Sequence, residues 1–121
     1  MSGGTLTLLE AEGADAGRWE GALADIPGAD IYFTPAYTRL FSGLNGDHAL
    51  GAIWESPRGR AVFPLQIRPL DRLPYWAPAW LGVLAGAPAY DAVSPYGYSG
   101  PITDAAAGEA PDLLREFTGA L

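Results

Sequence analysis

Two long strand-forming runs joined by a short turn constrain the fold of this chain most strongly. "HALGAIWES" at 48–56 and "GRAVFPLQIRPL" at 59–70 are rich in apolar and β-branched residues. Between the runs, Pro57 fixes its own φ and Gly59 tolerates a positive φ, as is typical of a tight turn. The pattern predicts a β-hairpin. Pro64 interrupts the second run and predicts an edge or a bulge there, because proline cannot donate to a strand ladder.

The segments before the hairpin predict one strand and two helices. Thr and Leu alternate over 5–11, which favours a strand, and a helix follows at 15–27, capped by Asp15. Its predicted apolar face consists of Trp19, Leu23 and Ile26. Thr34 followed by Pro35 is a typical helix start, because the side-chain oxygen caps free amides and proline fits the first turn. On this second helix the predicted apolar face consists of Tyr37, Leu40, Phe41 and Leu44.

The segments after the hairpin predict an irregular loop over 71–88, a short strand at 90–94 and a helix at 111–121. The final helix has a predicted apolar face of Leu113, Leu114 and Phe117. Strand, helix, helix, hairpin, strand, helix is an α+β or layered α/β order. We therefore expect one domain over 1–121, with a mixed, mostly antiparallel sheet flanked by helices.

The composition excludes several function classes. Fourteen acidic and seven basic residues give a formal net charge of −7, which disfavours general nucleic-acid binding and electrostatic attachment to an anionic membrane. The chain has no cysteine, no signal-peptide pattern at its start and no apolar run of about 20 residues. We expect a cytoplasmic protein without a membrane span.

The sequence offers no pattern for a metal site or a nucleophile. Its single histidine, His48, begins a predicted strand, and the acidic residues are dispersed along the chain. We expect no metal, and His48 is expected to be exposed or hydrogen-bonded. Ser94 and Ser99 do not occupy a Gly-x-Ser-x-Gly elbow.

The stretch "YDAVSPYGYSGPI" at 90–102 is the candidate functional segment, and two interpretations of it stay open. Its Gly and Pro residues fit a turn with tyrosines packed beneath it, or a loop with amides and phenols that line a cleft. Asp91 is a candidate general base or a charge at a strand edge. Arg68 is a candidate partner of Asp91, a group that holds an anion, or a surface ion-pair residue. The aromatic residues of 75–80 fit either a ligand wall or core.

Three motifs together resemble the first half of Fem-like proteins, a branch of the GNAT acyltransferase superfamily. They are "DIYFTPAYTRLF" at 30–41, "GRAVFPLQIRPL" at 59–70 and "YDAVSPYGYSGPI" at 90–102, and the resemblance covers roughly 30–102. The family includes peptidoglycan-bridge aminoacyltransferases and acetyltransferase-like proteins of polysaccharide and cell-envelope pathways. Its members carry two GNAT-like domains side by side, with an acceptor cleft between them.

The resemblance implies an acyl- or aminoacyltransferase that acts on an amine or hydroxyl acceptor, a small molecule or an envelope precursor. Acetyl-CoA or aminoacyl-tRNA is the implied donor for the full protein. The resemblance implies that five residues of the stretch 90–102 bind the substrate, and that Arg68 and Asp91 support the binding cleft. Those five are Tyr96, Gly97, Tyr98, Gly100 and Pro101.

The chain also departs from the family pattern. The usual acyl-CoA loop, Gln/Arg-x-x-Gly-x-Gly/Ala, is replaced by "SPYGYSGP", and no second domain follows. We therefore assign no cofactor and no catalytic base to this chain, and we expect it to be an incomplete GNAT-like unit. The alternative hypothesis is a non-catalytic module that pairs through an open sheet edge with a second subunit or a second copy.

Overall fold

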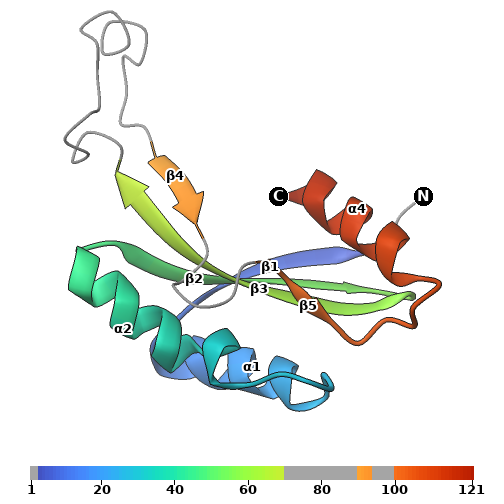
Figure 1. Cartoon of the computed structure of the whole chain (residues 1–121), viewed down its shortest axis with the longest axis horizontal. Coiled ribbons are helices and arrows are strands. Elements are labelled where there is room, and N and C mark those ends of the chain that lie inside the picture. Colours follow the sequence, from blue (N-terminus) through green and yellow to red (C-terminus); the bar gives the residue numbers. More distant parts are fainter. Residues whose placement is uncertain (1–2, 70–89, 94–99) are drawn as a thin grey trace, which may run out of the picture.

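The predicted hairpin lies at the centre of an antiparallel sheet (Figure 1). A computed structural model describes residues 3–69, 90–93 and 100–121 of the chain. Its helices and strands are, in chain order, β1 (Thr5–Glu10), α1 (Gly13–Ala24), η1 (Ile31–Phe33), α2 (Pro35–Asn45), β2 (His48–Ser56), β3 (Gly59–Pro69), β4 (Tyr90–Val93), β5 (Ile102–Thr103) and α4 (Ala110–Ala120). The fold is α+β, as predicted, with a mostly antiparallel sheet flanked by three α-helices.

The sheet has the order β1-β2-β3-β4, and β5 also pairs with β3. β2 and β3 pair without a slip from Ser56 opposite Gly59 to His48 opposite Ile67, which confirms the predicted hairpin and its turn. Every strand pair in the described part of the chain is antiparallel. Because side chains alternate along each strand, the sheet has two faces, and each needs its own cover.

One face packs against α1 and α2, which lie below the sheet in Figure 1. Trp19 and Leu23 of the predicted face are buried on α1, and Ile26 is buried just after the helix ends at Ala24. They pack with residues of β1, β2 and β3. The buried cluster includes Leu9, Trp19, Leu23, Ile26, Ile53 and Val62. Trp19 is fully buried and its indole N–H donates to the carbonyl of Phe33 at 2.9 Å. The Trp19 ring lies over Gly51, where a Cβ would come within 2.7 Å of the ring.

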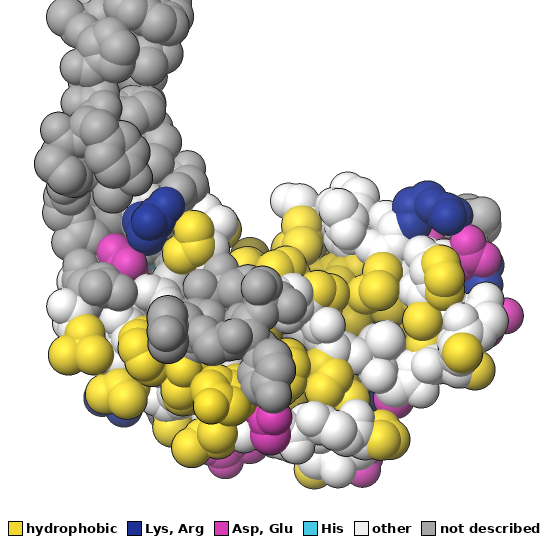
Figure 2. Space-filling view, in the orientation of Figure 1, with side chains coloured by type: hydrophobic (Ala, Val, Ile, Leu, Met, Phe, Trp, Pro, Cys, Tyr) yellow, Lys and Arg dark blue, Asp and Glu magenta, His cyan; other side chains and the backbone are white. Residues whose placement is uncertain are grey.

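The other face packs against α4. Leu113 and Phe117 are buried there against Ala61 and Trp54, and the Phe117 and Trp54 rings stack with centroids 6.3 Å apart. The predicted face of α4 is therefore confirmed. The part of this face that α4 does not contact is more exposed to solvent: Leu8 of β1, opposite Ala52, is 53% exposed. Figure 2 shows hydrophobic side chains gathered in a hollow between α4 and the far ends of β3 and β4.

Arg58, in the hairpin turn, connects the hairpin to α4. Its guanidinium contacts Glu109, lies 2.9 Å from Glu116 (Nε to Oε1) and 3.6 Å from Asp112 (Nη1 to Oδ2). The pKa of the Arg58 guanidinium is raised, most strongly by its hydrogen bond to Glu116 and next by its hydrogen bond to Glu109. The turn and the helix are thus joined by charge as well as by apolar packing.

Two predictions about the helices need correction. Asp15 does not cap α1: its Oδ2 accepts from the Glu10 N–H at 3.1 Å, and the N-cap residue, Glu12, makes no side-chain cap bond. The predicted apolar face of α2 is only partly right: Tyr37 and Phe41 are half-buried, but Leu40 and Leu44 are 58% and 73% exposed.

The buried side of α2 carries polar residues instead. Thr38 is 0% exposed and its hydroxyl donates back to the Thr34 carbonyl at 3.0 Å, while Ser42 is 2% exposed. The helix start at Thr34 and Pro35 is as predicted, since Thr34 Oγ1 accepts from the Tyr37 N–H. Gly46, in the left-handed conformation with φ 72°, follows its last residue. Short polar side chains therefore replace the expected apolar contact with the sheet.

The strand that pairs with the outer edge of β3 is interrupted. β4 places Val93 opposite Gln66, and β5 places Ile102 opposite Val62. Three residues of β3 lie between these pairs, whereas eight residues of the opposing chain lie between them, an excess of five. Val93 and Ile102, which flank the motif segment 94–101, therefore pair with the same edge of one strand.

Pro64 lies within this interruption. The backbone oxygen of Arg60 accepts from Asp104 N at 3.2 Å, so alternate residues of β3, including Pro64, direct their backbone groups toward the β4 and β5 edge. β3 is not an edge strand, and on its β2 side Pro64 lies opposite Gly51 in an unbroken register, so the β2–β3 ladder has no bulge there. On the β4 and β5 side no described residue pairs with Pro64, so its missing N–H leaves no ladder bond unmade in the described part of the chain.

Candidate functional site

Arg68 and Asp91 are the two predicted site residues that the structure brings together. They lie directly opposite each other in the register of β3 and β4. Arg68 is half-buried. Directly opposite residues of paired strands belong to the same face of a sheet, so the register assigns both positions to one face.

Gly100 and Pro101 lie farther along the same edge, immediately before β5. Gly100 is half-buried with φ 98°, a conformation that favours glycine, and Pro101 is exposed. Ile102 pairs with Val62, which is six residues from Arg68 along β3, a separation of about 20 Å at the usual rise of a strand. Tyr96, Gly97 and Tyr98 lie outside the described residues, as do the aromatic residues of 75–80. The structure therefore places the described site residues at the two ends of the interruption.

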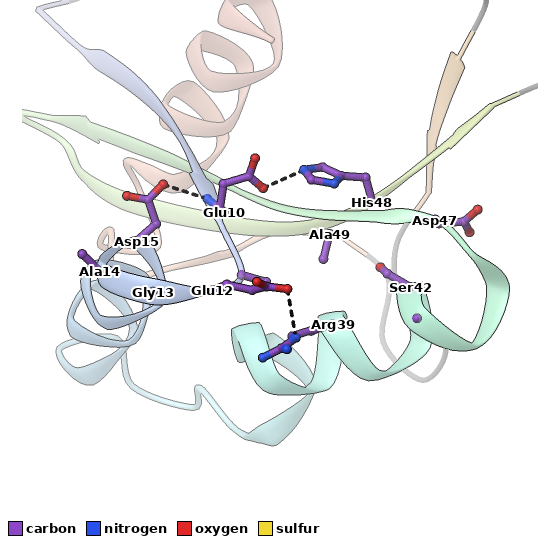
Figure 3. A pocket seen from close by; sticks show the side chains of 12 residues that line it. Glu10, Glu12, Gly13, Ala14, Asp15, Arg39, Ser42, Asp47, His48 and Ala49 are labelled. Carbon is purple, nitrogen blue, oxygen red and sulfur yellow. Dashed lines mark hydrogen bonds and ion pairs between the residues drawn. The ribbon is translucent and has the colours of Figure 1, made fainter.

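A pocket of about 730 Å³ lies elsewhere, where the end of β1 meets the start of α1, the last turns of α2 and the start of β2 (Figure 3). Its charged lining residues are Glu10, Glu12, Asp15, Arg39, Asp47 and His48. Antiparallel pairing brings the end of β1 close to the start of β2. Glu10, the last residue of β1, lies opposite Leu50, which is two residues after the start of β2 at His48. Such a volume is typical of a small-molecule site.

The charged side chains of the pocket are held in pairs. Glu10 Oε2 lies 2.6 Å from His48 Nε2, and Glu12 Oε1 lies 3.2 Å from Arg39 Nε. Gln66 Nε2 donates to Asp47 Oδ2 at 3.3 Å. The His48 side chain is exposed, as expected, and it contacts the Glu10 carboxylate.

Ser42 is the exception in this paired set. Its residue is almost fully buried, and its Oγ has no hydrogen-bond partner among the described residues. Figure 3 shows the side chain projecting from α2 toward Ala49, between the labelled groups. An unsatisfied buried hydroxyl is destabilising, which makes Ser42 a candidate binding residue of this pocket.

The described pocket lining is strongly acidic. Four carboxylates and one guanidinium give it a formal charge of −3 with His48 neutral. No three His, Asp or Glu side chains of the described chain are grouped as metal ligands. The lining therefore suits an organic cation better than a metal ion.

Compared with known proteins, the chain matches no family model, no curated protein and no solved structure. The likeness to Fem-like proteins therefore stays a prediction from motifs. Within the described residues, none of the helices has the length and apolarity needed to cross a membrane.

Sequence reasoning missed this pocket because its residues come from four elements. In the sequence the acidic residues look dispersed, but the fold brings together Glu10, Glu12 and Asp15 from one junction with Asp47 from another. One signal was available: three carboxylates fall within six positions at the boundary between a predicted strand and a predicted helix. Ser42 gave no signal, because its burial depends on the unexpected face of α2.

Proposed function

We propose that this chain is the N-terminal part of a GNAT-fold acyltransferase, with a second GNAT-like domain as its partner. The reaction is acetyl or aminoacyl transfer to an amine or hydroxyl acceptor in cell-envelope or polysaccharide metabolism. The element order supports it, since strand, two helices, hairpin, strand and helix is the order that the Fem-like resemblance implies. The antiparallel sheet with helices on both faces is also compatible with it.

The observation that carries the proposal is the pairing of β4 and β5, the strands on either side of the motif segment 94–101, with the same strand, β3. In the proposal, this segment presents backbone amides and phenols to a substrate. We place the acceptor beside this segment, which lacks the glycine spacing of an acyl-CoA loop.

The transfer breaks the bond between the acyl carbonyl carbon and the donor sulfur or ribose oxygen. A new amide or ester bond forms to the acceptor nitrogen or oxygen, and the proton of the acceptor leaves to the donor group. Arg68 would hold an anionic part of the substrate, which makes it a positioning residue.

The test is an acyl-transfer assay on the product of the complete reading frame, with acetyl-CoA or aminoacyl-tRNA as donor and amine and hydroxyl acceptors. We expect activity, and Arg68→Ala should raise KM for the acceptor about tenfold or more with a smaller effect on kcat. Arg115→Ala is the matched control, because Arg115 is exposed on α4 and pairs with Asp112. Absence of transfer with every donor, or equal kinetics for both variants, would contradict the proposal.

A specific observation favours a second candidate function, a non-catalytic module that pairs with another subunit or a second copy. The outer edge of β1 pairs with no described strand, and Leu8 on that strand is exposed. An edge built from Thr and Leu without Lys or Pro is open to β-pairing. Light scattering of the purified chain should then give the mass of two chains, and Leu8→Lys should halve it. A single-chain mass at all concentrations would exclude self-pairing.

A further inference from the structure

We infer that the pocket between β1, α1, α2 and β2 binds a small organic cation through a primary ammonium group. None of its described lining residues belongs to the stretch 90–102, and the inference does not depend on the proposed acyl transfer. Three properties of the described residues lead to it: the acidic lining, the unpartnered hydroxyl of Ser42, and the kinds of side chain that the lining lacks.

The charge of the lining selects for a cation. Arg39 pairs with Glu12, and Arg18, which is not a lining residue, lies 3.9 Å from Asp15 (Nη1 to Oδ1), so these guanidinium groups offset two of the four carboxylates. The amino terminus of α1 adds about half a positive charge, which reduces the negative potential without reversing it. The low dielectric of a pocket wall concentrates the electric field of the carboxylates. A cation therefore binds more favourably here than on an open surface.

Ser42 gives the cation a specific contact. A primary ammonium group has three donors and no acceptor, and it needs oxygen acceptors around it. The Ser42 Oγ supplies one of them, and because it lacks a partner in the described chain, no existing bond has to break. Glu12 and Asp47 line the same pocket and supply carboxylate oxygens for the remaining donors.

The composition of the lining narrows the class of cation. No aromatic side chain is among the described lining residues, whereas quaternary ammonium groups are usually held in aromatic cages. The absence of a three-ligand group in the described chain disfavours a divalent metal. A primary amine, bound by hydrogen bonds and charge, is the class that remains.

The test is an NMR titration of the ¹⁵N-labelled chain with 1,4-diaminobutane. We expect saturable shifts centred on the amides of Gly13, Gly43 and Ala49, which line the pocket. Succinate, which has the same number of carbons and the opposite charge, should produce no saturable shift. Shifts that do not saturate, that spread over the acidic surface, or that succinate reproduces would overturn the inference.

Two variants separate specific binding from general attraction. Ser42→Ala should weaken diamine binding about tenfold or more without lowering Tm, because it removes a hydroxyl that has no partner in the described fold. Thr118→Ala removes an exposed hydroxyl on α4, and Glu20→Gln removes one negative charge outside the pocket. Both controls should bind the diamine as the wild type does. Equal affinity of Ser42→Ala and wild type would overturn the role of Ser42 and the inference with it.

Discussion

At the scale of single residues, the packing of the sheet depends on small side chains that meet large ones. Trp19 fits onto β2 only because Gly51 has no side chain, and its indole N–H is satisfied by the Phe33 carbonyl. This contact joins α1, β2 and the segment before α2. A close-packed interior tolerates little added volume at such a point.

Gly51→Ala should therefore destabilise the protein by about 1–3 kcal/mol, because its Cβ must displace the Trp19 ring. Urea unfolding followed by tryptophan fluorescence measures this loss. Gly21→Ala is the matched control, since a Cβ at Gly21 meets nothing within 4 Å and the residue lies within α1. The control should be neutral or stabilising, and equal destabilisation by both changes would contradict the role of the Trp19 contact.

At the scale of elements, sequence patterns correctly predicted the features that depend on residues near one another in the chain. The turn at Pro57, the cap at Thr34 and the apolar faces of α1 and α4 depend on neighbours in the sequence, and the structure confirms them. The face of α2 was partly mispredicted, because Thr38 and Ser42 pack against the sheet where Leu40 and Leu44 were expected. β5 has only two residues and no periodicity to detect. The acidic pocket depends on tertiary pairing, which no local pattern encodes.

Arg58→Met should loosen α4 from the hairpin and lower Tm at low salt. Because the pKa of Arg58 is raised in the fold, its contribution is present at neutral pH and is lost only when the pH rises through that pKa, at strongly alkaline values. Salt screens exposed charges, so the difference from wild type should shrink in about 1 M NaCl.

Arg115→Met is the control for this charge contact, since Arg115 pairs with Asp112 within α4. Its Tm should stay close to that of the wild type at both salt concentrations. A Tm difference for Arg58→Met that does not change with salt would point to lost packing of its side-chain stem instead of lost ion pairs.

At the scale of the whole molecule, the two faces of the sheet are stabilised unequally. α1 and α2 cover one face, while α4 covers the other mainly through Leu113 and Phe117 (Figure 1). Removal of one of these side chains should therefore affect the stability of the entire sheet.

Phe117→Ala should lower the free energy of unfolding by about 3–5 kcal/mol, because it leaves a cavity against the Trp54 ring. Urea unfolding measures the loss, and Leu44→Ala, at an exposed position of α2, should change stability by about 0.5 kcal/mol or less. The unfolding of the Phe117→Ala variant can also be followed by near-ultraviolet circular dichroism. A cooperative urea transition with the same midpoint as the wild type would show that the sheet does not need α4 for its stability.

The orientation of Pro64 has a consequence for synthesis of the chain. Twenty residues separate the end of β3 from the start of β4, so the outer edge of β3 emerges from the ribosome before any strand that can cover it. At about 5–20 residues per second this edge is bare for on the order of seconds. During that time Pro64 places a position without an N–H on the open edge, where a neighbouring nascent chain would otherwise pair. The proline that has no described strand partner on this edge in the finished fold should thus protect the unfinished one against aggregation.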